Sequence, residues 1–184
     1  MMPAGPLMTE HRTIEKIVPP IRTEIERIRR GFDPDLGFLR SAVDFLKVYA
    51  DRCHHGKEED ILFRALAEKD LPEELGLLMG ELTAEHVWAR GKTGDLADAV
   101  RRLDGGEAAV VDVAGPLEEL SVFYPRHIER EDNRFFLPAM EFLSEEEQAE
   151  MFAAFQRFDG RLLHDVYASR MDEMADLGGD VSPA

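Results

Sequence analysis

The chain has 184 residues, enough for one domain with a continuous buried core. Its 38 acidic and 22 basic residues give a formal charge of −16, which argues against nucleic acid and anionic membrane surfaces as partners, because both would repel it. Cys53 is the only cysteine, so the chain can form neither an intramolecular disulfide nor a thiolate metal cluster. So low a cysteine content is typical of proteins in a reducing compartment.

Apolar residues recur at intervals of three and four, and alternating β-branched runs are almost absent, so we predict a nearly all-helical chain. The first expected helix runs from about 7 to 30, bent or interrupted at Pro19-Pro20, and the second runs from a cap at Asp33 to about 69. The third runs from 72 to about 104 with a break near 91–94, and the fourth, from about 107 to 142, is bent at its prolines or built of two pieces. The last begins at the capping box at Ser144. Long helices with short connections predict an antiparallel bundle.

The expected location is cytoplasmic. The sequence MMPAGPLMTEHR has neither a basic leader nor an apolar h-region, and no later run approaches the ~20 apolar residues that span a bilayer.

Histidines fall on the apolar faces of three predicted helices. His11 follows Leu7 by four residues and His86 follows Leu82 by four, so both lie within buried stripes. His127 lies on the apolar face of the fourth helix.

The second helix carries two adjacent histidines, and only one of them follows the apolar face of a regular helix. The line through His54 is mostly apolar and continues to Glu58, whereas the line through His55 carries Asp51 and Glu59. We therefore predict that His54 faces the core and that His55 is exposed or supports a ligand from outside.

The same HxxxE pattern occurs twice. The sequences HHGKEEDILF and HIEREDNRFF align without a gap and pair His54 with His127 and Glu58 with Glu131. Residues four apart share one face of a helix, so each histidine and its glutamate can coordinate around one cluster.

These residues form a chemically coherent metal-binding set. Together with His11 and His86, the two HxxxE turns supply four nitrogens and two carboxylates, enough for two cations with coordination positions left open. Without metal, burying the same groups unpaired would cost roughly several kcal/mol of folding free energy. Iron, manganese and zinc all suit this mixture of donors.

Four motifs in order, TEHRTIE, HHGKEEDILF, AEHVWARG and HIERED, make the chain resemble the hemerythrin-like, or HHE cation-binding, proteins over roughly residues 7–140. The resemblance implies an all-α fold: an antiparallel up-down four-helix bundle at about 7–142 with an additional C-terminal helix at about 144–176, within one domain spanning 1–184. It also implies a non-haem di-iron centre bridged by Glu58 and Glu131. The terminal ligands that it implies are His11, His54, His86 and His127.

One departure from the family pattern concerns the third helix. Oxygen-carrying members have HxxxH there, but Arg90 stands four residues after His86, so a fifth histidine is missing. We expect a more open centre or a borrowed ligand such as Glu85, Glu59 or a water.

The predicted function is to bind or sense dioxygen or a related small ligand, nitric oxide. The alternatives are a redox enzyme or iron-centre repair protein acting on peroxide or nitric oxide, and an iron-storage or iron-responsive module. The sequence predicts no specific protein partner. A ferritin-like site is disfavoured because no histidine follows a glutamate by three residues. Trp88, Tyr49 and Tyr124 are interpreted as packing residues rather than redox relays, and His164 as structural or exposed.

Overall fold

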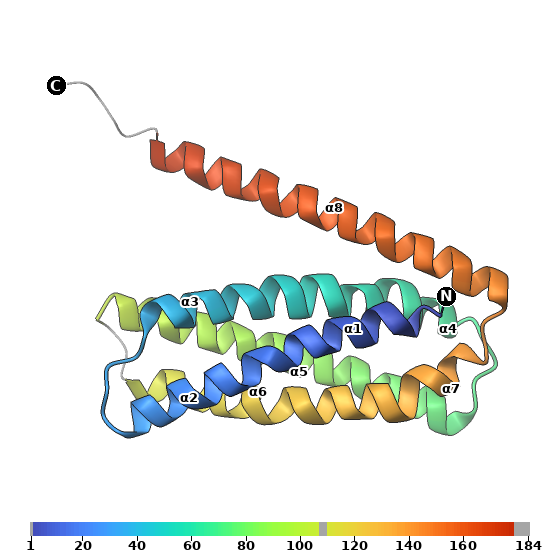
Figure 1. Ribbon diagram of the computed structural model, residues 1–184, viewed down its shortest axis with the longest axis horizontal. Coiled ribbons are helices and arrows are strands. Elements are labelled where there is room, and N and C mark those ends of the chain that lie inside the picture. The colour runs from blue at the N-terminus through green and yellow to red at the C-terminus, as the bar shows by residue number, and fades with distance from the viewer. Residues whose placement is uncertain (1, 107–109, 179–184) are drawn as a thin grey trace.

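Helices form almost all of the chain in this computed structural model, which describes residues 2–106 and 110–178, with side chains up to residue 162. No residue in these ranges lies in a strand. Four helical rods run alternately up and down, and a further helix follows them (Figure 1). The all-α bundle with an additional C-terminal helix is therefore confirmed.

Three of the four rods combine several helical segments. The first contains α1 (Ala4–Ile14), η1 (Glu15–Ile17) and α2 (Val18–Arg29), and the second contains α3 (Leu36–Phe45), η2 (Leu46–His55), η3 (Glu58–Phe63) and α4 (Arg64–Leu66). The third is α5 (Glu73–Asp104), and the fourth contains α6 (Val110–Arg130), η4 (Glu131–Phe135) and α7 (Phe136–Met140). The last helix is α8 (Glu145–Gly178). None of the described helices combines the length and apolarity of a membrane span.

Local signals predicted most helix ends, with two differences. The capping box is confirmed, since the backbone N–H of Glu147 donates to Oγ of Ser144 at 3.2 Å and that of Ser144 donates to the Glu147 carboxylate at 2.8 Å. The cap of the second rod is Asp35 rather than Asp33, because Oδ1 of Asp35 accepts from the N–H of Phe38 at 3.0 Å.

The predicted break near 91–94 is wrong, since α5 is continuous. Each glycine costs about 1 kcal/mol of helix propensity, but the buried stripe of α5 continues through Thr93 and Leu96 and outweighs that cost. In the fourth rod, α6 runs through Pro116 and Pro125 without ending. The predicted start of that helix near residue 107 lies outside the described residues.

Three of the segments are π-helical, with hydrogen bonds that span five residues rather than four: η2, η3 and η4. They contain or adjoin both HxxxE motifs. Because π-helical turns hold one more residue, they change the direction in which successive side chains point, and they are frequent at functional sites.

Two apolar clusters fill the bundle, one toward each end. Along the first rod, Leu7 belongs to one cluster and Ile14 to the other, with His11 between them. Along the third rod, His86 lies between Leu82 of the first cluster and the second cluster, which begins again at Leu96. The histidines therefore form a polar layer between two apolar ends.

The first half of α8 packs on the second rod, and its second half diverges from the bundle (Figure 1). The Phe158 ring lies against Gly56, where a Cβ atom would come within 2.8 Å of Cζ of the ring. The next residue, Asp159, pairs with the buried ammonium of Lys57 at 2.8 Å. α8 is thus anchored within the HHGKE motif itself.

Candidate metal centre

All six predicted ligands lie in the polar layer, with side chains exposed by 2% or less. They come from all four rods: one from the first, two from the second, one from the third and two from the fourth. These residues are His11, His54, Glu58, His86, His127 and Glu131. The side chain of His164 lies outside the described residues.

The first group gathers around His11 and His54. Their Nε2 atoms lie 2.8 Å apart. Nε2 of His11 lies 3.1 Å from Oε2 of Glu131, and Nε2 of His54 lies 3.3 Å from Oε1 of Glu58. Four potential ligand atoms therefore point at one small volume.

The second group gathers around His86 and His127, whose Nε2 atoms lie 3.2 Å apart. Nε2 of His86 lies 3.4 Å from Oε2 of Glu58 and also 3.4 Å from Oε1 of Glu131. The two oxygens of Glu58 thus face different groups. Oε2 of Glu131 lies between the groups, 3.1 Å from Nε2 of His11 and 3.3 Å from Nε2 of His127, so each carboxylate contacts both groups.

These separations match the spacing of donors around one cation. Ligands about 2.1 Å from a metal ion are about 3.0 Å apart across an octahedral edge and about 3.4 Å apart across a tetrahedral one. The closest contacts in the two groups are near these values, from 2.8 Å between His11 and His54 to 3.4 Å between His86 and the carboxylates.

His55 was predicted to be exposed or to support a ligand from outside, and the prediction of exposure is wrong, because its side chain is only 1% exposed and lies in the second group. Its ring stacks on His86 with centroids 4.0 Å apart and lies 5.6 Å from the ring of His127. Each of these three histidines offers a nitrogen within 4.8 Å of the others'. The fifth histidine therefore stands beside His54 rather than four residues after His86.

Several buried polar atoms of this layer make no hydrogen bond with any described residue: both ring nitrogens of His55 and all four carboxylate oxygens of Glu58 and Glu131. Buried polar atoms are almost always paired in folded proteins, because burying them alone costs free energy. Bound cations would engage these atoms, so the residues fit a two-metal centre.

A second layer of carboxylates lies beside Nδ1, the ring nitrogen of each histidine that faces away from the centre. Nδ1 of His11 donates to Asp132 at 2.7 Å, and Nδ1 of His54 donates to Glu10 at 3.0 Å. Nδ1 of His86 donates to Glu59 at 2.9 Å, and Nδ1 of His127 donates to Glu85 at 2.8 Å. Nδ1 of His55 lies 3.6 Å from Asp51. This arrangement fixes the tautomer that turns Nε2 toward the centre in the four hydrogen-bonded histidines. The suggestion that Glu59 or Glu85 replaces a missing ligand is not supported, because both support histidines.

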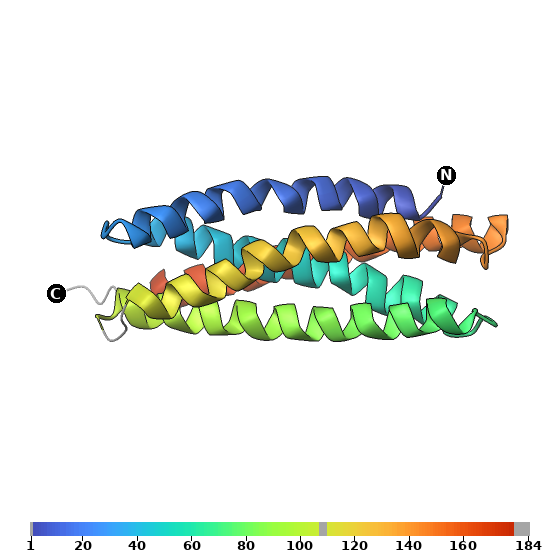
Figure 2. The same ribbon diagram turned by 90° about the horizontal axis from the view of Figure 1, so that it is seen from below.

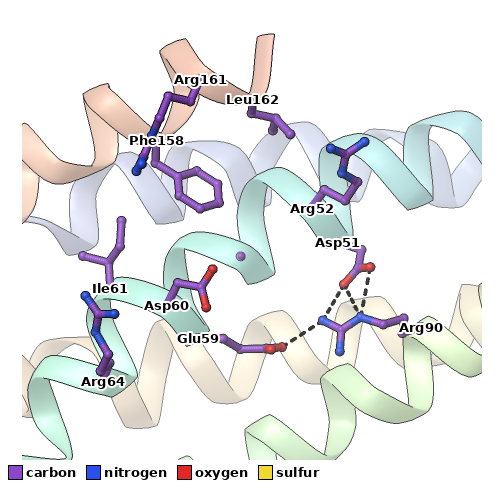
Figure 3. A pocket seen from close by; sticks show the side chains of 11 residues that line it. Asp51, Arg52, Glu59, Asp60, Ile61, Arg64, Arg90, Phe158, Arg161 and Leu162 are labelled. Atoms are coloured by element: carbon purple, nitrogen blue, oxygen red, sulfur yellow. Dashed lines mark hydrogen bonds and ion pairs between the residues drawn. The ribbon is translucent and has the colours of Figure 1, made fainter. Parts of the chain in front are cut away.

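A cation in turn pairs with each of these carboxylates. Arg90 binds Asp51 at 2.7 Å and Glu59 at 3.1 Å, as Figure 3 shows. The other pairs are Arg12 with Asp132, Lys57 with Glu10 and Arg130 with Glu85. Arg90, which stands four residues after His86, therefore supports two of the histidines from outside.

A third cluster, of Glu10, Cys53 and Asp159, is not a second metal site. The ammonium of Lys57 already lies among these groups, paired with both carboxylates. Burial, together with the negative charges of Glu10 and Asp159, raises the pKa of the Cys53 thiol to about 12, so it stays protonated and is a poor ligand.

Some buried groups of the polar layer bind protons when no cation is bound. Burial and the charge of Glu131 raise the pKa of Glu58 well above its usual value. Burial disfavours the charged form of His11, but the hydrogen bond to Asp132 and the nearby charge of Glu131 outweigh it and raise its pKa to about 9. Burial, followed by the charge of neighbouring histidines, lowers the pKa of His54 and His55.

Cation binding at pH 7 is therefore expected to release protons. A pKa of about 9 means that His11 is protonated at pH 7, and a cation must displace that proton as well as the one on Glu58. Calorimetric titrations in buffers of different ionisation enthalpy would count the protons. The affinity should fall as the pH is lowered, and the release should shrink above pH 9. Release of the same number of protons at pH 7 and above pH 9 would contradict the protonation of His11 at pH 7.

Glu85→Gln is expected to weaken cation binding by roughly 10- to 100-fold, because the amide no longer holds Nδ1 of His127 as a carboxylate does. Competition with a chelator of known affinity measures the change. Glu74→Gln, at an exposed position on the same helix, is the matched control. Equal affinities in the two variants would show that the outer carboxylates do not tune the centre.

A family model, the hemerythrin HHE cation-binding domain, matches residues 3–139. Neither a curated protein nor a solved structure matches the chain.

Proposed function

Since the chain belongs to the hemerythrin HHE cation-binding family, we propose that its polar layer holds a non-haem di-iron centre that binds or senses dioxygen or a related small ligand such as nitric oxide. The orphaned oxygens of Glu58 and Glu131 carry this proposal. Each of the two carboxylates lies between the two groups of histidines, and two cations bridged by it would pair with its oxygens.

The two groups offer unequal numbers of donors. The first has two imidazoles, His11 and His54, and the second has three, His55, His86 and His127. With one oxygen from each shared carboxylate, the groups offer four and five protein donors. An octahedral cation takes six donors, so the two-histidine group leaves more room for an external ligand.

The surrounding residues prepare this position. Apolar clusters on both sides of the layer exclude bulk water, and the Phe136 ring stacks on His11 at 5.5 Å. Asp132 and Glu10 hold the rings of His11 and His54 with Nε2 facing inward. Iron would supply the reversible coordination of a diatomic ligand.

The buried His55 favours a binding or sensing role over the alternatives. The expectation of a redox enzyme, or of an iron-centre repair protein acting on peroxide or nitric oxide, rested on a centre with a missing histidine. With five histidines at hand, the second group is well supplied with nitrogen donors, and one open position on the other side suits a small ligand.

The test is anaerobic purification followed by elemental analysis and absorption spectra before and after air. Two irons per chain, with charge-transfer bands that appear in air and reverse when oxygen is removed, would support oxygen binding. Bands that appear and do not reverse would favour the redox enzyme, and the absence of an oxygen response would favour storage or an iron-responsive module. Stoichiometric manganese or zinc would replace iron in the proposal, and absence of any bound metal would refute it.

A further inference from the structure

Aromatic rings stack on three histidines of the polar layer, and one of these contacts leads toward solvent. The stacked pairs are Phe136 with His11 at 5.5 Å, Phe63 with His86 at 5.8 Å and Phe123 with His127 at 5.0 Å. Phe63 and Phe136 are buried. Among the described ring contacts, only Phe123 continues to a strongly exposed ring.

That exposed ring is Trp88, the only tryptophan in the chain. Its centroid lies 5.0 Å from that of Phe123, and its side chain is 39% exposed. Two consecutive ring contacts of 5.0 Å therefore connect the solvent to His127. Such close ring contacts give a short path for electron tunnelling.

Trp88 and Phe123 also line a surface pocket of about 550 Å³, and His127 forms part of its wall. The pocket lies between α5 and α6, which run side by side (Figure 2). The ammonium of Lys92 lies 5.9 Å from the centroid of the Trp88 ring. Glu119 of the pocket pairs with this ammonium at 2.8 Å and balances its charge. The indole is thus within reach of water and of small reductants in solution.

We propose that Trp88 is a one-electron donor to the metal centre, acting through Phe123 and His127, and this inference rests on the proposed iron centre. Hydrogen peroxide at the iron-loaded centre is the oxidant and accepts two electrons and two protons to give two waters; the iron would supply one of these electrons, and the indole of Trp88 the other. The indole Nε1 proton goes to water. A thiol in solution then transfers one electron and one proton to the indole radical and becomes a thiyl radical, and two thiyl radicals combine to form a disulfide. The route removes oxidising equivalents before they damage the ligand histidines.

Tyrosines fit this role less well. Tyr124 contacts Phe123 with ring centroids 5.3 Å apart, but it is buried, and burial raises its pKa. Oxidation of a phenol requires loss of its proton, which has no ready route to water there. Tyr49 stacks on Phe45, and no described ring contact links this pair to a histidine of the layer.

The experiment exposes iron-loaded and zinc-loaded protein to hydrogen peroxide without a thiol. Peptide mass spectrometry then measures the oxygen added to Trp88, and electron paramagnetic resonance detects an indole radical. We expect several-fold more Trp88 oxidation with iron than with redox-inert zinc, and suppression by added thiol. Phe123→Leu should lower the Trp88 oxidation, Trp88→Phe should abolish the radical signal, and Tyr49→Phe, the matched control, should change neither.

Metal counts and absorption spectra before peroxide separate this inference from the proposed function. Failure of the wild-type chain to load iron would overturn both. If the centre loads, equal Trp88 oxidation with iron and zinc would overturn the electron route alone, because the oxidation would then come from solution. Unchanged oxidation in a fully loaded Phe123→Leu variant would do the same.

Discussion

Glu131→Gln is expected to abolish stable binding of both cations. Oε2 of Glu131 lies 3.1 Å from Nε2 of His11, and Oε1 lies 3.4 Å from Nε2 of His86, so this one carboxylate serves both groups. An amide cannot offer two anionic oxygens. The loss should exceed the roughly 10- to 100-fold cost of changing an outer carboxylate, because Glu131 is itself a bridge. Elemental analysis after anaerobic reconstitution measures it.

The matched control is Glu129→Gln, which makes the same chemical change at an exposed position on the same rod. It should retain both cations. Circular dichroism should show the same helix content in both variants, since glutamine keeps the shape of the buried side chain. A Glu131→Gln protein that still holds two cations would refute the bridging role.

His55→Ala is expected to leave the three-histidine group unable to hold its cation, so that the chain retains one ion or none. The ring of His55 lies 4.0 Å from that of His86, and both of its nitrogens lack a hydrogen bond with any described residue. A loss as large as that of His54→Ala is therefore expected. The prediction from the sequence, that His55 is exposed or supports a ligand from outside, would give only a modest loss.

Replacing a buried ring with alanine also leaves a cavity, which could disturb metal binding through packing. His55→Leu separates the two effects, because leucine fills most of the volume without offering a donor. Equal loss of metal in both variants would identify His55 as a ligand. Two cations bound to His55→Ala with unchanged affinity would return the centre to four histidines.

Local pattern was sufficient for the helices and for six members of the polar layer. Spacing of three and four residues identifies a buried face wherever the helix is regular, as it is around His11 and His86. The repeated HxxxE pattern then pairs each glutamate with a histidine one turn away. These relations lie within single helices, so one sequence is enough to see them.

Only the tertiary structure decided the position of His55 and the identity of the outer layer. The face of a regular helix admits one of two adjacent histidines, but the π-helical turns of η2 and η3 let both His54 and His55 be buried. The hydrogen-bonded partners of Nδ1 come from other rods: Glu10 reaches His54 across 44 positions of sequence. Contacts of this kind follow from the packing of four helices against one another, which no periodicity within one helix encodes.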